Sequence, residues 1–349
     1  MFFIHQTVCI SPQITFPEQD LDQLVNCNEK KLYARDVSYS GIPPALLRRM
    51  GKAVKLGVAA STPLFKLIDK LDGIIIGTAN GGMEDCIKFL NQIVQYEEGV
   101  LTPTNFVQST PNAIAAQLGF LFKNKGYNIT HVHRGLAFEN AILDTAMLLE
   151  DNPDNNYLLG GLDEISDYNF NIEYLCGYVK KEKFNNDDDL YSSTTNGSIA
   201  GEAVAMFIVN NSGIGATSEL KAIRTIHTTD ETELKLIFEK FIKDNLLQNE
   251  NIDLFLSGEN GDSRYKKYYR LMESLVNTDV TIARYKHMCG EFQTASAFAL
   301  WLSNTIIQTQ QIPDHMLKKQ LHNKNINNIV IYNNYQGLQH SFMLISKCN

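Results

Sequence analysis

The chain has 349 residues, of which 44% are hydrophobic and 20% are charged. This composition supports a sizeable core and excludes a wholly disordered protein. The net charge of −8 argues against nucleic-acid binding, because neutralising phosphates takes clustered Lys and Arg.

Strands and helices are expected to alternate along the chain. Short apolar runs that end in Gly are typical of strands buried on both faces of a sheet, and helical periodicity or small residues mark the segments between them. The expected strands are 2–11, 71–82, 155–161, 201–213, 216–229 and 252–262, with a closing hairpin over 328–346. The expected helices are 41–68, 84–98, 231–247, 263–276 and 294–311, and 102–124 is expected to be a loop that leads into a helix.

This alternation predicts an α/β fold with helices on both faces of the sheet. Two rounds of similar element order occupy residues 1–213 and 214–349, and no linker separates them. We therefore expect two halves packed as one unit. The polar segment 184–198 is the best candidate for an exposed insertion.

The sequence predicts neither a metal, a cofactor nor a membrane segment. Six cysteines, at positions 9, 27, 86, 176, 289 and 348, form no CxxC pair and no zinc spacing, which is typical of reduced thiols in a cytoplasmic protein. The first residues lack the positive region of a signal peptide. No apolar run approaches the roughly 18 residues of a membrane span.

Residues 125–164 have the pattern of a strand, a tight turn, a helix and a second strand that ends in Gly-Gly. A turn of this kind often holds a nucleophile at the start of the helix. Ser, Thr and Cys are all absent from 131–140, however. The sequence therefore predicts the turn without its nucleophile.

Five segments, in order along the chain, resemble the β-ketoacyl synthase family of the thiolase-like fold. Residues 105–119 resemble the family's segment before the nucleophile, and 155–164 resemble the Gly-Gly strand after it. Residues 197–209 resemble the Gly-Glu-Gly strand, with Ala203 in place of the last Gly. Residues 285–300 resemble the Lys-x-x-x-Gly-His segment, and 333–346 resemble the closing hairpin. The resemblance covers nearly the whole chain. It implies a five-layer αβαβα fold with a synthase-like N-terminal half, 1–213, and a C-terminal half, 214–349.

The chemistry of that family uses a Cys that takes the acyl chain as a thioester, and two His that polarise its carbonyl and assist decarboxylation. By the resemblance, the Cys position is Gly135 and the second His position is Glu291. The family's Lys is kept as Lys286, and we expect it to pair with Glu291. The first His position falls on one of three residues, none of them His: Gly258, Glu259 or Asn260.

The resemblance therefore implies a condensing-enzyme fold that has lost condensation. The chain most resembles the chain-length-factor subunits of type II polyketide systems. Within that group it most resembles the synthase-like proteins of aryl-polyene and flexirubin pathways. Such a subunit would form a heterodimer with an active ketosynthase, or a homodimer, through the thiolase-fold interface, and could contact an acyl carrier protein. One alternative is an acyltransferase or decarboxylase that uses Glu259, Glu291 or His133. Another is a homodimer that only binds a carrier protein or an acyl chain.

The residues around the vacated turn have two interpretations. Arg134 and His133 could clamp an anion at the helix N-terminus, or they could fill the site or face a partner. His131 and His133 are expected to share one face of a strand that, in synthase dimers, pairs with its twin. No third ligand that would make these His a zinc site stands nearby. By the resemblance, eight residues line the vacated pocket: His133, Arg134, Gly135, Glu259, Asn260, Lys286, Glu291 and Tyr335.

Other charged residues are expected to have structural roles. Asp262 could join Glu259 and Glu291 in a carboxylate cluster, but capping the helix over 263–276 is the simpler expectation. Three basic residues are expected on one helix face, as a solvated surface or a dock for an acidic carrier protein: Arg48, Lys52 and Lys55. Phe298 and Trp301 are expected in the core or an interface, and His287 and His340 are expected to be satisfied core or surface residues. Tyr335 lies near the position of the family's gating Phe.

Overall fold

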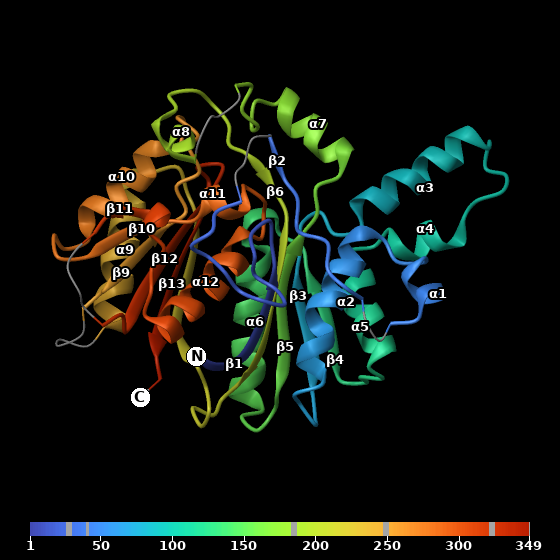
Figure 1. Ribbon diagram of the computed structural model, residues 1–349, viewed down its shortest axis with the longest axis horizontal. Helices are drawn as coiled ribbons and strands as arrows, with labels where there is room; N and C mark the ends of the chain where they lie inside the picture. Colours follow the sequence, from blue (N-terminus) through green and yellow to red (C-terminus); the bar gives the residue numbers. More distant parts are fainter. Residues whose placement is uncertain (26–29, 40–41, 183–186, 247–250, 321–324, 349) are drawn as a thin grey trace.

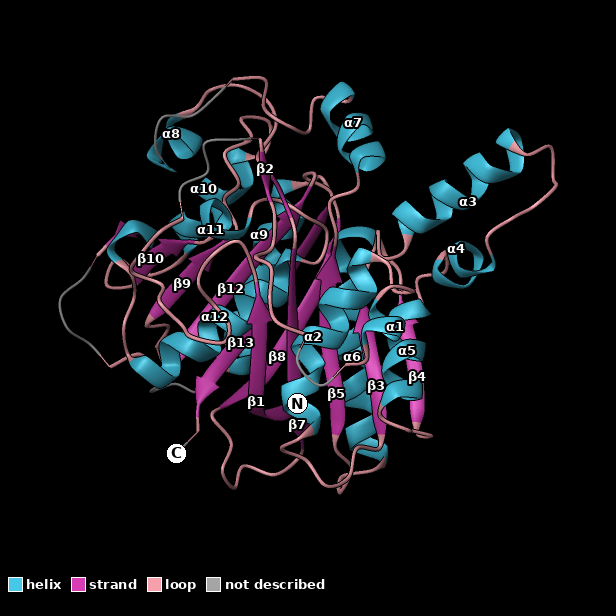
Figure 2. Cartoon of the chain, turned by 45° about the vertical axis from the view of Figure 1, so that its right-hand side comes forward, coloured by secondary structure: helices cyan, strands magenta, loops and turns pink. Residues whose placement is uncertain are grey.

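The computed structural model describes residues 1–25, 30–39, 42–182, 187–246, 251–320 and 325–348. Its main sheet has 11 strands within these residues, in the order β11-β10-β9-β12-β13-β8-β1-β7-β5-β3-β4 (Figures 1 and 2). The N-terminal half contributes β1 (Phe2–Ile10), β3 (Gly73–Gly77), β4 (Tyr127–His131), β5 (Tyr157–Asp163) and β7 (Ala203–Asn210). The C-terminal half contributes β8 (Ser218–His227), β9 (Leu254–Ser257), β10 (Thr281–Arg284), β11 (Leu317–Lys319), β12 (Asn328–Tyr335) and β13 (Gln339–Lys347). A separate short pair joins β2 (Lys31–Leu32) to β6 (Ala200–Gly201).

The two halves of the sheet repeat one pattern. In the first, β4, β3 and β5 are parallel to one another, and β7 and β1 follow in antiparallel pairing. In the second, β10, β9 and β12 are parallel, and β13 and β8 follow in antiparallel pairing. The halves meet where Phe2–Ile4 of β1 pairs with Ser218–Leu220 of β8. The C-terminal half of the sheet thus repeats the strand order and directions of the N-terminal half.

Helices pack between the inner faces of the two halves of the sheet and cover their outer faces. The outer face of the N-terminal half packs against α2 (Lys52–Phe65) and α5 (Ala113–Leu121), and that of the C-terminal half against α9 (Glu231–Asn245) and α10 (Lys266–Leu275). Between the halves lie α6 (Ala137–Asp151) and α12 (Ala295–Thr309). All side chains from Ala295 to Ile307 are buried, which explains why α12 has no polar face. Its small residues allow close packing: a Cβ on Gly161 of β5 would lie 2.5 Å from the Cβ of Ala297.

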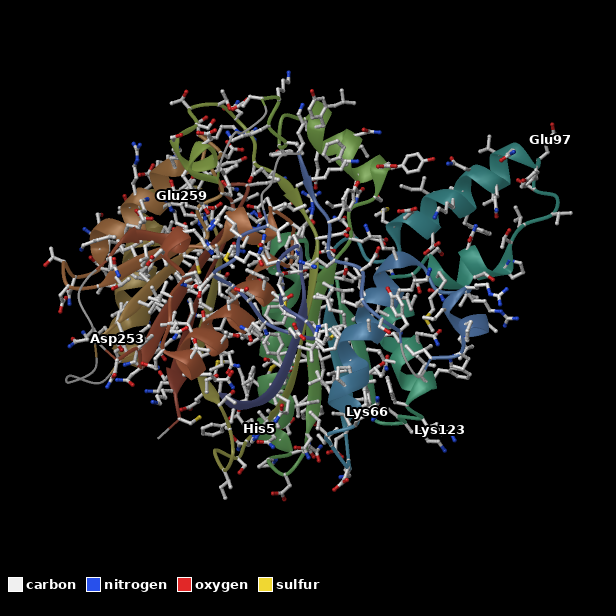
Figure 3. The ribbon with its side chains drawn as sticks, viewed as in Figure 1. His5, Lys66, Glu97, Lys123, Asp253 and Glu259 are labelled. Carbon is white, nitrogen blue, oxygen red and sulfur yellow. The ribbon has the colours of Figure 1, made fainter. Side chains whose placement is uncertain are left out.

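An arm projects from the N-terminal half (Figure 1). It consists of α3 (Met83–Gln95) and α4 (Pro103–Gln108), and Figure 3 places Glu97 at its tip. The sequence predicted α3, but the segment that holds α4 was expected to be a loop. Large apolar side chains are exposed on this arm: Leu90, Val94, Val100, Phe106 and Val107.

Two local expectations were wrong. The helix expected over 41–68 is divided into α1 (Pro44–Leu47) and α2, with Gly51 in an extended conformation at the start of α2. The segment 184–198 is not a wholly exposed insertion, because Leu190 and Tyr191 of α8 (Asp187–Ser192) are buried; its first residues lie outside the described part of the chain. In the described residues, no helix combines the length and apolar content needed to cross a bilayer.

Candidate functional site

The predicted turn lies between β4 and α6. The strand ends at His131, and Arg134 adopts a left-handed backbone conformation with φ of +48°. A short 3-10 turn, Arg134–Leu136, then leads directly into α6. Gly135 is buried within it, at the position where the resemblance places the nucleophile. Residues with a side chain rarely adopt positive φ, so this sharp turn is a specific feature of the site.

Other parts of the chain occupy the space around Gly135. A Cβ on Gly135 would overlap the Cβ and Cγ of Tyr335 and lie 2.9 Å from its Cδ1. The backbone N–H of Gly135 donates a hydrogen bond of 3.0 Å to Oε1 of Gln339. A free N–H at the start of a helix would be a natural donor to an oxyanion. In this structure the β12–β13 hairpin fills the space for a side chain on Gly135 with Tyr335 and accepts the Gly135 N–H with Gln339.

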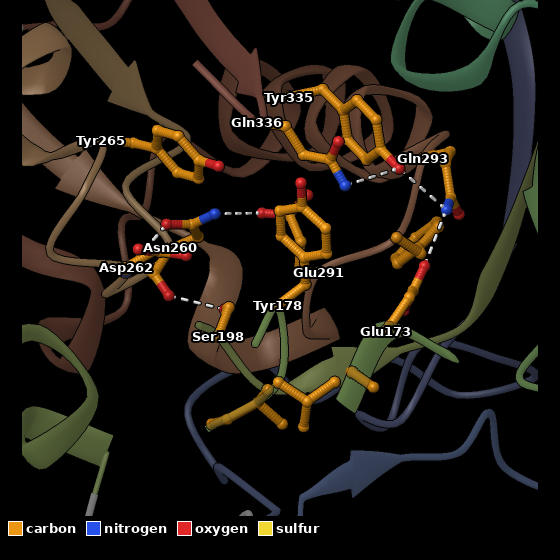
Figure 4. A pocket seen from close by; sticks show the side chains of 14 residues that line it. Glu173, Tyr178, Ser198, Asn260, Asp262, Tyr265, Glu291, Gln293, Tyr335 and Gln336 are labelled. Atoms are coloured by element: carbon orange, nitrogen blue, oxygen red, sulfur yellow. Dashed lines mark hydrogen bonds between the residues drawn. The ribbon is translucent and has the colours of Figure 1, made fainter. Parts of the chain in front are cut away.

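Residues that the resemblance places near the two His positions meet in one polar cluster. Lys286, at the start of α11 (Lys286–Cys289), is fully buried, and its Nζ donates to Oε1 of Glu291 at 2.8 Å. Nδ2 of Asn260 donates to the other carboxylate oxygen of Glu291 at 2.7 Å (Figure 4). Gly290, with φ of +74°, turns the chain between them where a side chain would overlap the backbone of Gly201. The expected Lys286–Glu291 pair is therefore present.

Of the candidates for the first His position, only Asn260 reaches this cluster. Glu259 accepts instead from Nζ of Lys318 at 2.7 Å and lies 3.7 Å from the guanidinium of Arg284. Figure 3 places Glu259 within the C-terminal half. Glu259, Glu291 and His133 thus have different hydrogen-bond and ion-pair partners.

A small cavity of about 30 Å³ separates this cluster from Tyr335 (Figure 4). Nε2 of Gln293 donates to Oε1 of Glu173 at 3.1 Å and to the hydroxyl of Tyr335 at 3.2 Å. Gln336 also donates to that hydroxyl at 3.2 Å. Burial raises the pKa of Glu173, on α7 (Asp167–Leu175), to about 7. The cavity has room for only one or two waters, because polar side chains occupy most of the space between the cluster and Tyr335.

Four residues of this network were not anticipated from the sequence: Glu173, Gln293, Gln336 and Gln339. Gln339 meets Gly135 across 204 residues of sequence, so no local spacing could have indicated the contact. Gln293 lies within the segment that resembles the family and follows Glu291 by two residues. Gln336 directly follows Tyr335, so closeness in sequence to a predicted pocket residue was a signal for both Gln293 and Gln336.

The structure separates the two histidines near the turn. The strand ends at His131, whose Nε2 lies 2.9 Å from Asp144. His133 lies beyond it, and its Nδ1 is 3.2 Å from Nδ2 of Asn140. The expectation that both share one strand face is therefore wrong. No group of three His, Cys, Asp or Glu suited to a metal occurs in the described residues.

Two expectations for charged residues were also wrong. Asp262 does not cap α10, which begins at Lys266 without a side-chain cap, and instead binds Arg264. The basic stripe does not share one helix face, because Arg48 lies outside α2. Lys52 is also committed to an ion pair of 2.6 Å with Glu202.

Phe298, Trp301, His287 and His340, for each of which the core was one expected location, are all buried. Phe298 and Trp301 pack together on α12 with ring centroids 5.6 Å apart. His287 bonds to the Tyr191 hydroxyl and to His315. His340 bonds to the Tyr332 hydroxyl, and burial lowers its pKa to about 4.

Comparisons with known proteins agree with the observed fold. Residues 24–173 match the family model of the beta-ketoacyl synthase N-terminal domain. No match was found among curated proteins. The ishigamide ketosynthase/chain length factor structure superposes with a TM-score of 0.77 at 13% identity, over 100% of this chain and 99% of that one.

Two further solved structures share the fold. One is a ketosynthase (ApeO) in complex with its chain length factor (ApeC) from Xenorhabdus doucetiae, with a TM-score of 0.76 at 10% identity, covering 99% of this chain and 98% of that one. The other is a type II polyketide acyl-carrier protein in complex with its ketosynthase (AntDE:AntF), with a TM-score of 0.72 at 16% identity, covering 99% of each chain. The predicted resemblance and the thiolase-like fold are thereby confirmed.

Proposed function

We propose that this chain, which has the β-ketoacyl synthase fold, is a non-catalytic subunit of the chain-length-factor type that pairs with an active ketosynthase. The observation that carries the proposal is the closed turn at Gly135. Condensation needs a nucleophile that holds the acyl chain and donors that stabilise the developing oxyanion. Gly135 has no side chain, Tyr335 occupies the space for one, and Gln339 accepts the N–H.

The polar cluster supports the same conclusion. An imidazole can donate or accept a proton near neutral pH, whereas the amide of Asn260 cannot titrate. The carboxylate of Glu291 is held by Lys286 and Asn260 at 2.8 and 2.7 Å. These residues stabilise one another, so the cluster serves the fold and not decarboxylation.

The edge of the sheet at β4 supports pairing with a second subunit. β4 is the terminal strand of the main sheet (Figure 2), so one row of its backbone N–H and C=O groups has no neighbouring strand in the described chain. Large apolar side chains are exposed on β4, on the residue after it and on the flanking helices α5 and α6: Tyr127, Val132, Phe120 and Met147. An unpaired edge with exposed apolar residues is typical of a protein interface.

The partner is expected to be the synthase that supplies the missing Cys and two His. Two of the structural neighbours described above are complexes or pairs of a ketosynthase with a chain length factor, which favours this partner over a second copy. A third contains an acyl-carrier protein, the expected source of the acyl chain.

The test is the native mass of the protein isolated from its own cell extract, with mass-spectrometric identification of what accompanies it. A one-to-one complex with a longer synthase that carries the Cys and two His is expected. The isolated chain should not condense malonyl and acyl thioesters. A homodimer or monomer without a synthase, or turnover by the isolated chain, would contradict the proposal.

A further inference from the structure

A hollow of about 650 Å³ lies beside the turn and is bordered by Tyr335. This volume lies in the range of about 300–1,000 Å³ that small-molecule sites occupy. The polar residues that line it include His133, Arg134, His227, Gln336 and Gln339. Gln293, Tyr335 and Gln336 border both this hollow and the small cavity around Glu291, and their other lining residues differ.

The charge of this hollow is opposite to that of the chain. The protein carries a net charge of −8, yet all the lining residues are described and none of them is Asp or Glu. They include one guanidinium and two imidazoles. The neighbouring cavity, in contrast, is lined by the carboxyl groups of Glu173, Asp262 and Glu291. An acid-free hollow with these three side chains is complementary to an anion.

Arg134 is the residue that decides this complementarity. Its side chain is exposed, and within the described residues it makes no hydrogen bond and no ion pair. The backbone there has a φ of +48°, which is unfavourable for any residue with a Cβ. Gln339 adds a neutral donor, because its Oε1 accepts from Gly135 and its Nε2 has no partner among the described residues.

We propose that Arg134, with His133 and His227, binds a ligand that bears a carboxylate or a phosphate group in this hollow. A guanidinium presents paired N–H donors that match the two oxygens of either group. The ligand is a small anion or the anionic part of a larger molecule such as an acyl thioester. Every residue that the proposal uses belongs to this chain, so it is tested without a synthase, although Val132 of the proposed subunit interface also lines the hollow.

The test is calorimetric titration of the purified full-length chain with malonate and, separately, with inorganic phosphate, at constant ionic strength set with chloride. We expect one-to-one binding of at least one probe, and the probe that binds identifies the anionic group. Arg134→Gln should weaken binding at least about tenfold, since hydrogen bonds to charged groups are among the stronger ones. Arg48→Gln, which changes an exposed arginine outside the hollow, should leave the affinity unchanged.

Arg134→Gly separates binding from folding. Glycine adopts positive φ without the penalty of a Cβ, so this variant should melt no lower than the unmodified chain while losing anion binding. Failure of both probes to bind above the chloride background would overturn the proposal. So would an unchanged affinity in both Arg134 variants.

Discussion

Tyr335 stands in the space that a side chain on Gly135 would occupy. A Cβ on Gly135 would overlap the first two side-chain carbons of Tyr335, and the hydroxyl of Tyr335 is held by both Gln293 and Gln336. The closed turn is thus a packing relationship between two segments 200 residues apart in the sequence. It follows that a cysteine introduced at position 135 alone would not recreate a working thiol.

Gly135→Cys is expected to destabilise the fold by about 1–3 kcal/mol, the usual cost of inserting atoms into a packed site. Tyr335→Gly removes the overlapping carbons, so the double variant should be more stable than the sum of the two single changes by at least about 0.5 kcal/mol. Chemical denaturation of the four proteins measures this coupling. Strictly additive free energies of unfolding would show that the two positions do not compete for space.

Removing the carboxylate of Glu291 should leave the buried ammonium of Lys286 without its partner. We expect Glu291→Gln to cost about 3 kcal/mol of unfolding free energy, at the low end of the range for broken buried pairs. The reason is that 17% of the Glu291 side chain is exposed. Glu239→Gln, in the exposed pair of Lys235 and Glu239, is the matched control and should cost less than about 0.5 kcal/mol. Equal costs for the two variants would contradict a structural role for the cluster.

Glu139 on α6 should make stability depend on pH. Burial raises its pKa from 4.5 to about 7, while Ser341 donates to it at 2.7 Å. Because the folded protein holds this proton more tightly than the unfolded chain, the stabilisation is fully present below pH 4.5 and is lost as the pH rises through about 7. The loss is on the order of 3 kcal/mol.

Glu139→Gln should therefore reduce the fall of the unfolding free energy between about pH 5 and 7.5. A smaller slope should remain, because burial also raises the pKa values of Glu164 and Glu173 to about 7. Denaturation at a series of pH values checks this. Parallel profiles for the variant and the unmodified protein would exclude Glu139 as a source of the slope.

The surface around β4 should carry the contact with the synthase. Phe120 and Met147 are 72% and 58% exposed, so Phe120→Glu and Met147→Glu should leave the melting temperature nearly unchanged. Each should weaken association with the partner at least about tenfold, as charged substitutions within an apolar interface do. Ile214→Glu, at a side chain 90% exposed in the connection from β7 to β8, is the control. Equal partner affinities in all three variants would place the interface elsewhere.

Most of the fold could be predicted from the sequence, because its strands are apolar runs and its motifs occur in order. The position of Gly135 in the turn could be predicted by counting back from the Gly-Gly strand, because no gap interrupts the segment between them. The stripe of Arg48, Lys52 and Lys55 failed because helical spacing alone does not reveal that Gly51 breaks the helix. Likewise, the two histidines near the turn could not be placed without knowing that the strand ends at His131.

The parts of the site that were not predictable depend on contacts between distant segments. Sequence alignment could not choose among residues 258–260, and it could not show that Asn260 contacts Glu291 whereas Glu259 contacts Lys318. The contacts of Tyr335 and Gln339 with Gly135 join the closing hairpin to the turn after β4, and no pattern within either segment indicates them. A polar residue in a buried segment shows that a partner exists but not which one.

The most direct test of the central claim is to incubate the complex from its own cells with an acyl thioester and then measure the intact mass of each subunit. The account predicts that the acyl group is added to the partner synthase and that the mass of this chain is unchanged. An acyl adduct on this chain would show that it has a nucleophile of its own and would contradict the proposed function.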